Sequence, residues 1–303
     1  MMSPELPTAQ WKSVIDQLAD LGCRRVSIVG GEPLLRADLA EIIGQVRRRK
    51  MSCVLTSNGL LVSERITWLR GLSTLVLSLD AAGPAHDEVR GEGTFDSVLK
   101  SIEVARRNRI PVKINAVLSA KTSSGLDDLL DFVGKHNLHI TLSIMRSGTP
   151  ALWRDAASIK DDDEDIRKML VELARLTKRN SRILFSETTY RYASRWDDYS
   201  KDRHERGDLS PDNFLSKMGP QCQAGRYFMT ILPDGSVSPC VNTIGQIQGG
   251  NAIADGLSSA WRSLHGHRCV ACYSPCLVEL NYLFSLHPRV VLNFISKHWS
   301  RYS

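Results

Sequence analysis

Five of the seven cysteines of this 303-residue chain lie in its last third, at a spacing that suits metal binding. They follow the pattern C-x12-G-x4-C and then C-x2-C-x3-C, and are Cys222, Cys240, Cys269, Cys272 and Cys276. A hairpin carrying one thiolate beside a tight Cys-x-x-Cys loop can bring four sulfurs around one centre, either zinc or an iron–sulfur cluster. The spacing leaves both open, and five cysteines exceed one four-ligand site. Cys23 and Cys53 stand singly and are expected to be buried apolar residues.

A second candidate site follows a short apolar run. Residues 26–29 predict a buried strand, which ends in Gly30, Gly31, Glu32 and Pro33. Two successive glycines remove both Cβ atoms, so a ligand can lie against bare backbone at the carboxyl end of the strand. Pro33 stiffens the exit. This edge of α/β sheets is where ligands bind, although an ordinary glycine turn is the alternative.

Alternating strands and helices must position this strand end. Strands are predicted at residues 24–30, 52–56, 73–79, 111–118 and 138–145, and helices at 8–21, 38–50, 63–69, 95–108 and 124–136. Thr8 and Asp38 stand where they can cap two of the helices. A polar loop is predicted to carry His86, Asp87 and Arg90. The order predicts a parallel α/β sheet with right-handed crossovers, and five strands suit an open or partial barrel.

The remaining chain predicts a helical segment, a linker and a small domain. The acidic run 161–165 is expected to form the first turn of a helix at 166–179, with metal binding as the alternative. The polar stretch 191–217 predicts a linker or mobile loop. A hairpin is predicted around Pro233-Asp234-Gly235, then a short helix at 257–264 and a helical tail at 277–299. The predicted domains are 1–150, 151–217 and 218–303.

Composition excludes some classes of function. The net charge of +6 comes from 39 basic and 33 acidic residues, and the densest basic cluster, 47–50, closes a predicted helix. With no interleaved aromatic residues, that cluster does not predict nucleic-acid binding. No uncharged apolar run of about 18 residues exists to span a membrane. The N-terminus shows neither a signal nor a transit peptide, so a cytoplasmic location is expected.

Taken together, these motifs resemble the radical S-adenosylmethionine (SAM) enzymes with a C-terminal SPASM or twitch-type auxiliary iron–sulfur domain. The resemblance covers residues 20–120 for the catalytic core and 220–280 for the auxiliary domain. Its motifs are Gly30-Gly31-Glu32-Pro33, Thr56-Ser57-Asn58-Gly59, Ser78-Leu79-Asp80, His86-Asp87-Glu88-Val89-Arg90-Gly91 and the five late cysteines. Each motif is weak by itself, and the order and spacing make the set specific.

The resemblance implies two cofactors, SAM and an auxiliary [4Fe–4S] cluster. In the family the glycine-ended strand holds the methionyl amino group of SAM, a role that would fall to Gly30, Gly31 and Glu32. Ser78 matches a position that contacts the ribose or carboxylate, and the further candidates are Ser57, Asp80, Arg90 and Asn115. For each of these, a polar cap or a loop salt bridge is the alternative. The cluster ligands would be Cys222, Cys240 and two of Cys269, Cys272 and Cys276.

One departure from the family is the absence of its C-x3-C-x2-C loop, which follows the first barrel strand and binds the catalytic [4Fe–4S] cluster. We therefore expect a partial six-stranded barrel lacking its first strand, from a truncated or mis-started chain or a degenerate protein. The chain as given is expected not to cleave SAM. A full-length form would be an oxidoreductase-type enzyme acting on a peptide or small metabolite, with a flavodoxin or ferredoxin as reductant. The alternative is a non-catalytic iron–sulfur or zinc-binding module.

Overall fold

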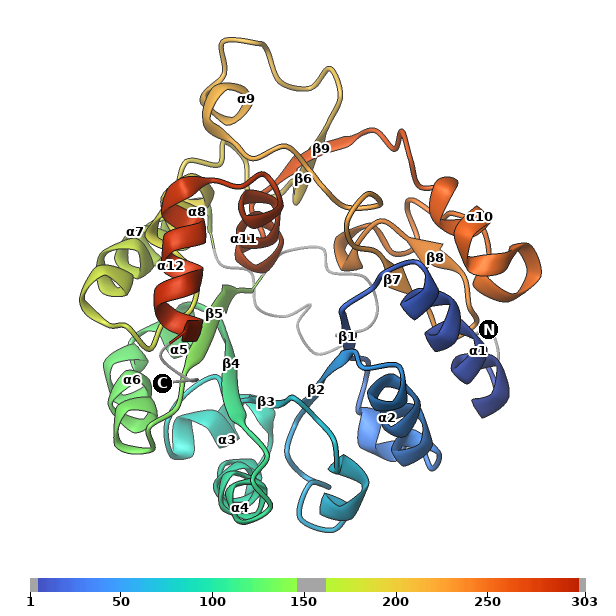
Figure 1. Cartoon of the computed structure of the whole chain (residues 1–303). Helices are drawn as coiled ribbons and strands as arrows, with labels where there is room; N and C mark the ends of the chain where they lie inside the picture. The colour runs from blue at the N-terminus through green and yellow to red at the C-terminus, as the bar shows by residue number, and fades with distance from the viewer. Residues whose placement is uncertain (1–4, 146–161, 300–303) are drawn as a thin grey trace. The chain divides into compact units, whose positions relative to one another are not determined.

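The structure, a computed structural model, describes residues 5–145 and 162–299 (Figure 1). The chain divides into two compact units that interleave along the sequence. Unit 1 comprises Met1–Asn115 and Met229–His265, and unit 2 comprises Ala116–Phe228 and Gly266–Ser303. The domain boundaries 1–150, 151–217 and 218–303 stay a prediction.

A five-stranded sheet runs in the order β1-β2-β3-β4-β5, and the alternating pattern predicts its five strands. Its strands are β1 (Arg25–Ile28), β2 (Ser52–Ser57), β3 (Thr74–Ser78), β4 (Val112–Leu118) and β5 (Ile140–Ile144). The pairs β1-β2, β2-β3 and β3-β4 are parallel. The helices of this region are α1 (Thr8–Asp20), α2 (Leu39–Arg48), α3 (Pro84–Arg90), α4 (Thr94–Arg107), α5 (Ala120–Ser123) and α6 (Leu126–Lys135), with 3₁₀ turns at Pro33–Leu35 and Ile66–Leu69.

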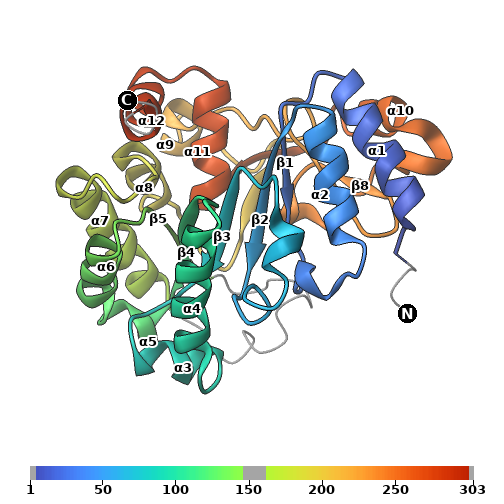
Figure 2. The same cartoon turned by 60° about the horizontal axis from the view of Figure 1, so that its bottom comes forward.

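Hydrophobic periodicity explains how these elements pack. Leu75 and Leu77 of β3 alternate with half-buried residues and are fully buried. In α4, Val98, Ile102 and Ala105 recur at helical spacing and are buried as well. Figure 2 shows α2 and α4 covering the same face of strands β1–β3. The parallel strands therefore end at one common edge, where their following loops meet.

Three local expectations differ from the structure. The predicted polar loop with His86, Asp87 and Arg90 is the helix α3, because Gly83 takes a positive φ and Pro84 at the first helical position is preset for helix. Thr8 is the first residue of α1 and its hydroxyl donates to Asp38. Asp38 precedes α2, but its carboxylate pairs with Arg36 instead of capping the helix.

Unit 1 also contains the predicted hairpin. Strands β7 (Thr230–Ile231) and β8 (Val237–Ser238) pair antiparallel, and Gly235 between them has a φ of +84°. The helix α10 (Leu257–Arg262) follows, with irregular turns at Val241–Thr243 and Ala252–Gly256. Leu6, Val14, Ala252 and Leu257 form a small core, so the hairpin region packs on the N-terminal helix.

Besides α5, α6, β5 and the end of β4, unit 2 contains helices and one short ribbon. These elements are α7 (Asp163–Arg179), α8 (Glu187–Ala193), β6 (Arg203–Glu205), α9 (Phe214–Met218), β9 (Cys269–Cys272), α11 (Pro275–Phe284) and α12 (Pro288–Trp299). Asp162 accepts from the Asp165 amide, so the acidic run starts α7 as predicted, while Asp161 lies outside the described residues. The stretch 191–217 is not a polar linker, because Trp196 and Tyr199 within it are fully buried.

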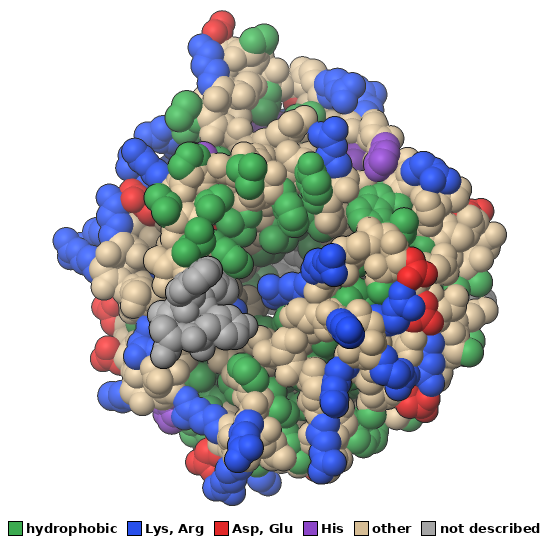
Figure 3. Space-filling model, viewed as in Figure 1, with side chains coloured by type: hydrophobic (Ala, Val, Ile, Leu, Met, Phe, Trp, Pro, Cys, Tyr) green, Lys and Arg blue, Asp and Glu red, His purple; other side chains and the backbone are tan. Residues whose placement is uncertain are grey.

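The surface carries separate basic and apolar side chains. On the face in Figure 3, Lys and Arg side chains are scattered and do not form one patch. The exposed large apolar side chains include Leu286 and Leu292, 77% and 65% exposed. Within residues 5–145 and 162–299, no helix is both long and apolar enough to cross a bilayer.

Candidate functional site

The glycine shelf, Gly30 and Gly31, follows β1 after one residue, Val29, and is exposed. An ideal Cβ built on either glycine would meet no heavy atom of residues 5–145 and 162–299 within 4 Å. The side chains of these described residues thus leave the predicted shelf open. The space above the backbone can accept a small ligand, and the carbonyls of the shelf are acceptors for an ammonium group.

The carboxylate of Glu32 fixes the end of this shelf to the neighbouring strand. Its Oε1 accepts from the Ser57 hydroxyl at 3.0 Å and from the Leu34 amide at 3.1 Å, and its Oε2 accepts from the Asn58 amide at 2.8 Å. A carboxylate has about four acceptor sites, so one is left for a ligand. Pro33 begins the 3₁₀ turn that places Leu34 within reach. Glu32 and Ser57 were predicted as ligand contacts, and the structure brings them together.

A second polar group lies after β3. Ser78 is the last residue of β3 and pairs with Asn115 of β4 in the parallel ladder. Two residues on, the Asp80 carboxylate accepts from Arg90 Nε at 2.6 Å. The Asp80 amide donates to His86 Nδ1 at 3.2 Å, so the ring proton of a neutral His86 is on Nε2. Burial lowers the pKa of His86. The four predicted contacts thus form two neighbouring pairs at this strand end.

Asp87, inside the same motif, has a structural role. Its carboxylate accepts from the amides of Phe95 and Gly93 and from the Thr94 hydroxyl. These hydrogen bonds, the one from Phe95 first, lower the pKa of Asp87. Its carboxylate therefore satisfies amides at the start of α4, which fixes the turn that follows Arg90.

The late cysteines divide between the two units: Cys240 belongs to unit 1, and Cys222, Cys269, Cys272 and Cys276 belong to unit 2. None of the seven cysteines forms a disulfide. A hydrogen bond with the Cys269 thiol lowers the pKa of Cys222, helped by the amide of Ala224 and by nearby His267. These neighbours favour the thiolate, the form that binds metal. Cys53 is buried, as predicted, and burial raises its pKa to about 12.

The two cysteines of β9 lie on one face of the β6–β9 ribbon. Cys269 pairs with Glu205 and Cys272 pairs with Arg203. Between these pairs β9 advances by three residues and β6 by two, so β9 carries one extra residue, a β-bulge. In a regular strand, residues three apart point to opposite faces. Because of the bulge, Cys269 and Cys272 face the same way.

Among the described residues, no three His, Cys, Asp or Glu side chains meet the geometry of a single-ion site. The ligands of a cluster bind different irons and stand farther apart than those of one ion. The donor chemistry nevertheless fits a thiolate-bound centre, because Cys222 is poised toward its thiolate form and hydrogen-bonds with Cys269. The Cys276 sulfur lies 3.4 Å from the Ser274 hydroxyl. The Cys240 sulfur lies 3.7 Å from the Thr243 hydroxyl.

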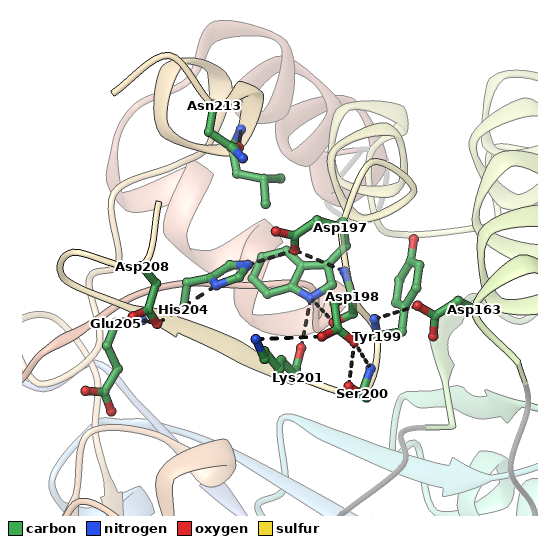
Figure 4. Close-up of polar contacts among 12 residues, drawn as sticks. Asp163, Asp197, Asp198, Tyr199, Ser200, Lys201, His204, Glu205, Asp208 and Asn213 are labelled. Carbon is green, nitrogen blue, oxygen red and sulfur yellow. Dashed lines mark hydrogen bonds and ion pairs between the residues drawn. The ribbon is translucent and has the colours of Figure 1, made fainter. Parts of the chain in front are cut away.

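Sequence reasoning missed the residues that support β9. Figure 4 shows the His204 ring of β6 beside Asp197 and Asp208, with Nε2 at 2.8 Å from Asp197 Oδ1. The same ring lies on Trp196, with 4.5 Å between ring centroids. These residues fall in the stretch predicted as a linker. The signal that could have found them is the pair of aromatic residues, Trp196 and Tyr199, inside an otherwise charged segment.

Two family models match parts of this chain. Residues 2–133 match the model of the radical SAM superfamily, and residues 222–278 match SPASM, an iron–sulfur cluster-binding domain. A probable GTP 3′,8-cyclase of Sulfolobus acidocaldarius is 32% identical over 242 residues, covering 78% of this chain and 72% of that protein. An AdoMet-dependent heme synthase of Oleidesulfovibrio alaskensis is 26% identical over 245 residues, covering 78% of this chain and 62% of that protein.

Solved structures share the fold. Streptococcus suis SuiB, bound to its precursor peptide SuiA, superposes with a TM-score of 0.62 at 22% identity, covering 88% of this chain and 60% of that chain. This likeness confirms the predicted α/β partial-barrel fold with its small C-terminal region. The chain spans 62 to 65% of the length of the curated relatives that match it first. On the two family-model matches and the 32% identity to the Sulfolobus acidocaldarius protein, the chain belongs to the radical SAM superfamily, with a SPASM region, and its cofactor classes are SAM and [4Fe–4S] clusters.

Proposed function

We propose that this chain forms the SAM-binding shelf and the auxiliary-cluster region of a radical SAM enzyme that modifies a peptide. The observation that carries the proposal is the open shelf at Gly30 and Gly31, closed at one end by Glu32. An open backbone edge with one free carboxylate acceptor site suits the ammonium end of an amino acid. Ser78, Asp80, Arg90 and Asn115, at the next strand end, would contact the rest of the cofactor.

The peptide substrate is inferred from a structural relative. SuiB binds a precursor peptide. The heme synthase is a reason to keep a small metabolite as the second substrate class. The iron–sulfur groups supply one-electron chemistry when bound, and an external reductant of the flavodoxin or ferredoxin class would feed them. This chain's own residues hold and orient SAM and supply the thiolates of the auxiliary cluster.

The proposed ligand set combines Cys222, Cys240 and two cysteines from the C-terminal motif. Cys269 and Cys272 are the better pair, since they share one face of the ribbon and Cys269 hydrogen-bonds with Cys222. Metal analysis after anaerobic reconstitution tests this set. About four irons and matching sulfide per chain, with a brown colour, would support it. One zinc per chain in colourless protein would instead support the zinc-binding module.

The 303 residues contain no C-x3-C-x2-C motif. We therefore propose that this chain by itself binds SAM weakly and does not cleave it. The test is an anaerobic incubation of reconstituted protein with SAM and dithionite, followed by chromatography for 5′-deoxyadenosine. Cofactor binding is measured separately by calorimetry. Formation of 5′-deoxyadenosine above the level of a metal-free control would overturn this part of the proposal.

A further inference from the structure

The β6–β9 ribbon has a second consequence at the cysteine face. Directly opposed residues of an antiparallel pair lie on the same face, so Arg203 shares a face with Cys272, and Glu205 shares it with Cys269. The 3.8 Å ion pair between Arg203 Nη2 and Glu205 agrees with this placement, because residues two apart in a strand face the same way. An arginine therefore lies beside the sulfur atoms of β9.

Arg203 keeps one donor without a partner. Its Nη1 lies 3.4 Å from Asp202 and its Nη2 faces Glu205, but its buried Nε has no hydrogen-bond partner among the described residues. The side chain is only 17% exposed. Leaving a buried charged N–H unpaired is unfavourable, so such a group indicates an acceptor that binds there.

His204 holds the opposite face of the ribbon. It pairs with Ala271, between the two cysteine positions. Its ring hydrogen-bonds with Asp197 (Figure 4) and also packs on the ring of Trp196. Trp196 is itself held, because its Nε1 donates to the carbonyls of Asp198 and Lys201. A shift of one residue in the β6–β9 register would turn His204 away from Asp197 and Trp196, and Arg203 away from Cys272. The register is thus fixed from the side that carries no cysteine.

We propose that Arg203 donates its Nε–H to a sulfur of the iron–sulfur cluster held by Cys269 and Cys272, and thereby raises the reduction potential of that cluster. The inference rests on the proposed function, which assigns a cluster to these cysteines. Reduction adds one negative charge to the cluster, and a neighbouring guanidinium with an N–H···S bond stabilises that charge. Arg203 is a positioning and tuning residue and is not itself an iron ligand.

The experiment is an EPR-monitored redox titration of the reconstituted chain. Arg203→Gln removes the positive charge and replaces the charged Nε donor with a neutral amide, and we expect the reduction equilibrium constant to fall at least about tenfold, or ~59 mV for one electron. Arg203→Lys keeps the charge but loses the planar donor, and a smaller shift in the same direction is expected. Arg206→Gln is the matched control, because Arg206 is an exposed arginine directly after β6. Its potential should equal that of the unmodified chain.

Iron and sulfide content separate the possible failures. A potential that stays unchanged in Arg203→Gln with full iron would overturn the role of Arg203. If Arg203→Gln loses its iron, Arg203→Lys decides: a lowered potential supports the role, and an unchanged one overturns it. An unmodified chain that binds no iron would instead refute the proposed function.

Discussion

The glycine shelf of unit 1 and the cysteine face of unit 2 present ligand groups in different ways. The shelf uses backbone left bare by Gly30 and Gly31, and Glu32 connects it to the next strand of the same sheet. The cysteine face uses side chains whose direction depends on a bulge and on pairing with β6, about 65 residues earlier in the chain. A backbone site tolerates changes in its surroundings, whereas a side-chain site depends on the register of its strand.

The largest expected effect comes from the sulfur atoms themselves. Cys269→Ala and Cys222→Ala should each lower the affinity for iron by more than the about 10–100-fold that loss of an outer partner costs. Cys23→Ala is the control, because Cys23 lies in no metal motif. The measurement is iron bound per chain after desalting. Equal iron in all three variants would show that the cysteine face is not the metal site.

The shelf should respond through Glu32. Glu32→Gln replaces a carboxylate oxygen with an NH₂ group, which cannot accept from the Asn58 or Ser57 donors. A loss of about 1.5–3 kcal/mol in the free energy of unfolding is expected, with weaker SAM binding. Urea unfolding and calorimetry measure the two effects, and Glu41→Gln on the exposed side of α2 is the control. If binding weakened without any loss of stability, Glu32 would serve the ligand alone.

The buried Lys297 of unit 2 predicts that the stability of the fold depends on pH. Lys297 of α12 is buried against the Ile183 carbonyl and Thr177, and burial lowers its pKa to about 8 from 10.5. Between these values the unfolded chain holds a proton that the folded chain lacks, so stability rises with pH from about 8 to 10.5. The stability that Lys297 contributes at high pH is therefore lost as the pH falls from about 10.5 to about 8, and its size is on the order of 2 kcal/mol.

Unfolding of Lys297→Met, measured at several pH values, checks this sign. The difference in the free energy of unfolding between the unmodified chain and the variant should change between about pH 8 and 10.5. Lys217→Met, at an exposed lysine, should show no such trend. The nearby Glu279 carboxylate, which accepts from Ser186 and Thr189, must be considered in the fit, since it opposes the effect on Lys297. If this difference in the free energy of unfolding did not change with pH, Lys297 would be charged in the folded chain.

The smallest effect is expected at the turn after β2. The buried Ser101 hydroxyl donates to the Gly59 carbonyl at 2.7 Å and so connects α4 to the turn beside Glu32. Ser101→Ala should cost about 1 kcal/mol, the net value of one neutral hydrogen bond. Ser97→Ala, on the exposed side of the same helix, serves as the comparison. A much larger loss would indicate that the shelf depends on distant packing as strongly as the cysteine face does.

Much of the shelf could be predicted because it depends on short-range signals. The apolar run before Gly30 predicts β1, although the predicted burial is wrong, because residues of β1 are exposed or half-buried. Asn58-Gly59 predicts a turn that needs a positive φ, observed at +88° for Gly59. The cysteine face could be predicted only as a list of residue types. Its geometry depends on β6, a three-residue strand with no periodicity of its own inside a charged stretch.

The sequence by itself determined the five strands, the hairpin at Gly235 and the two groups of site residues, because hydrophobic period and turn chemistry are local properties. Only the tertiary structure decided that Cys269 and Cys272 share a face, that Arg203 lies beside them and that Asp87 serves as a structural acceptor. Those outcomes depend on which distant strand or amide each residue meets. A bulge of one residue reverses the direction of a side chain without any change in local composition.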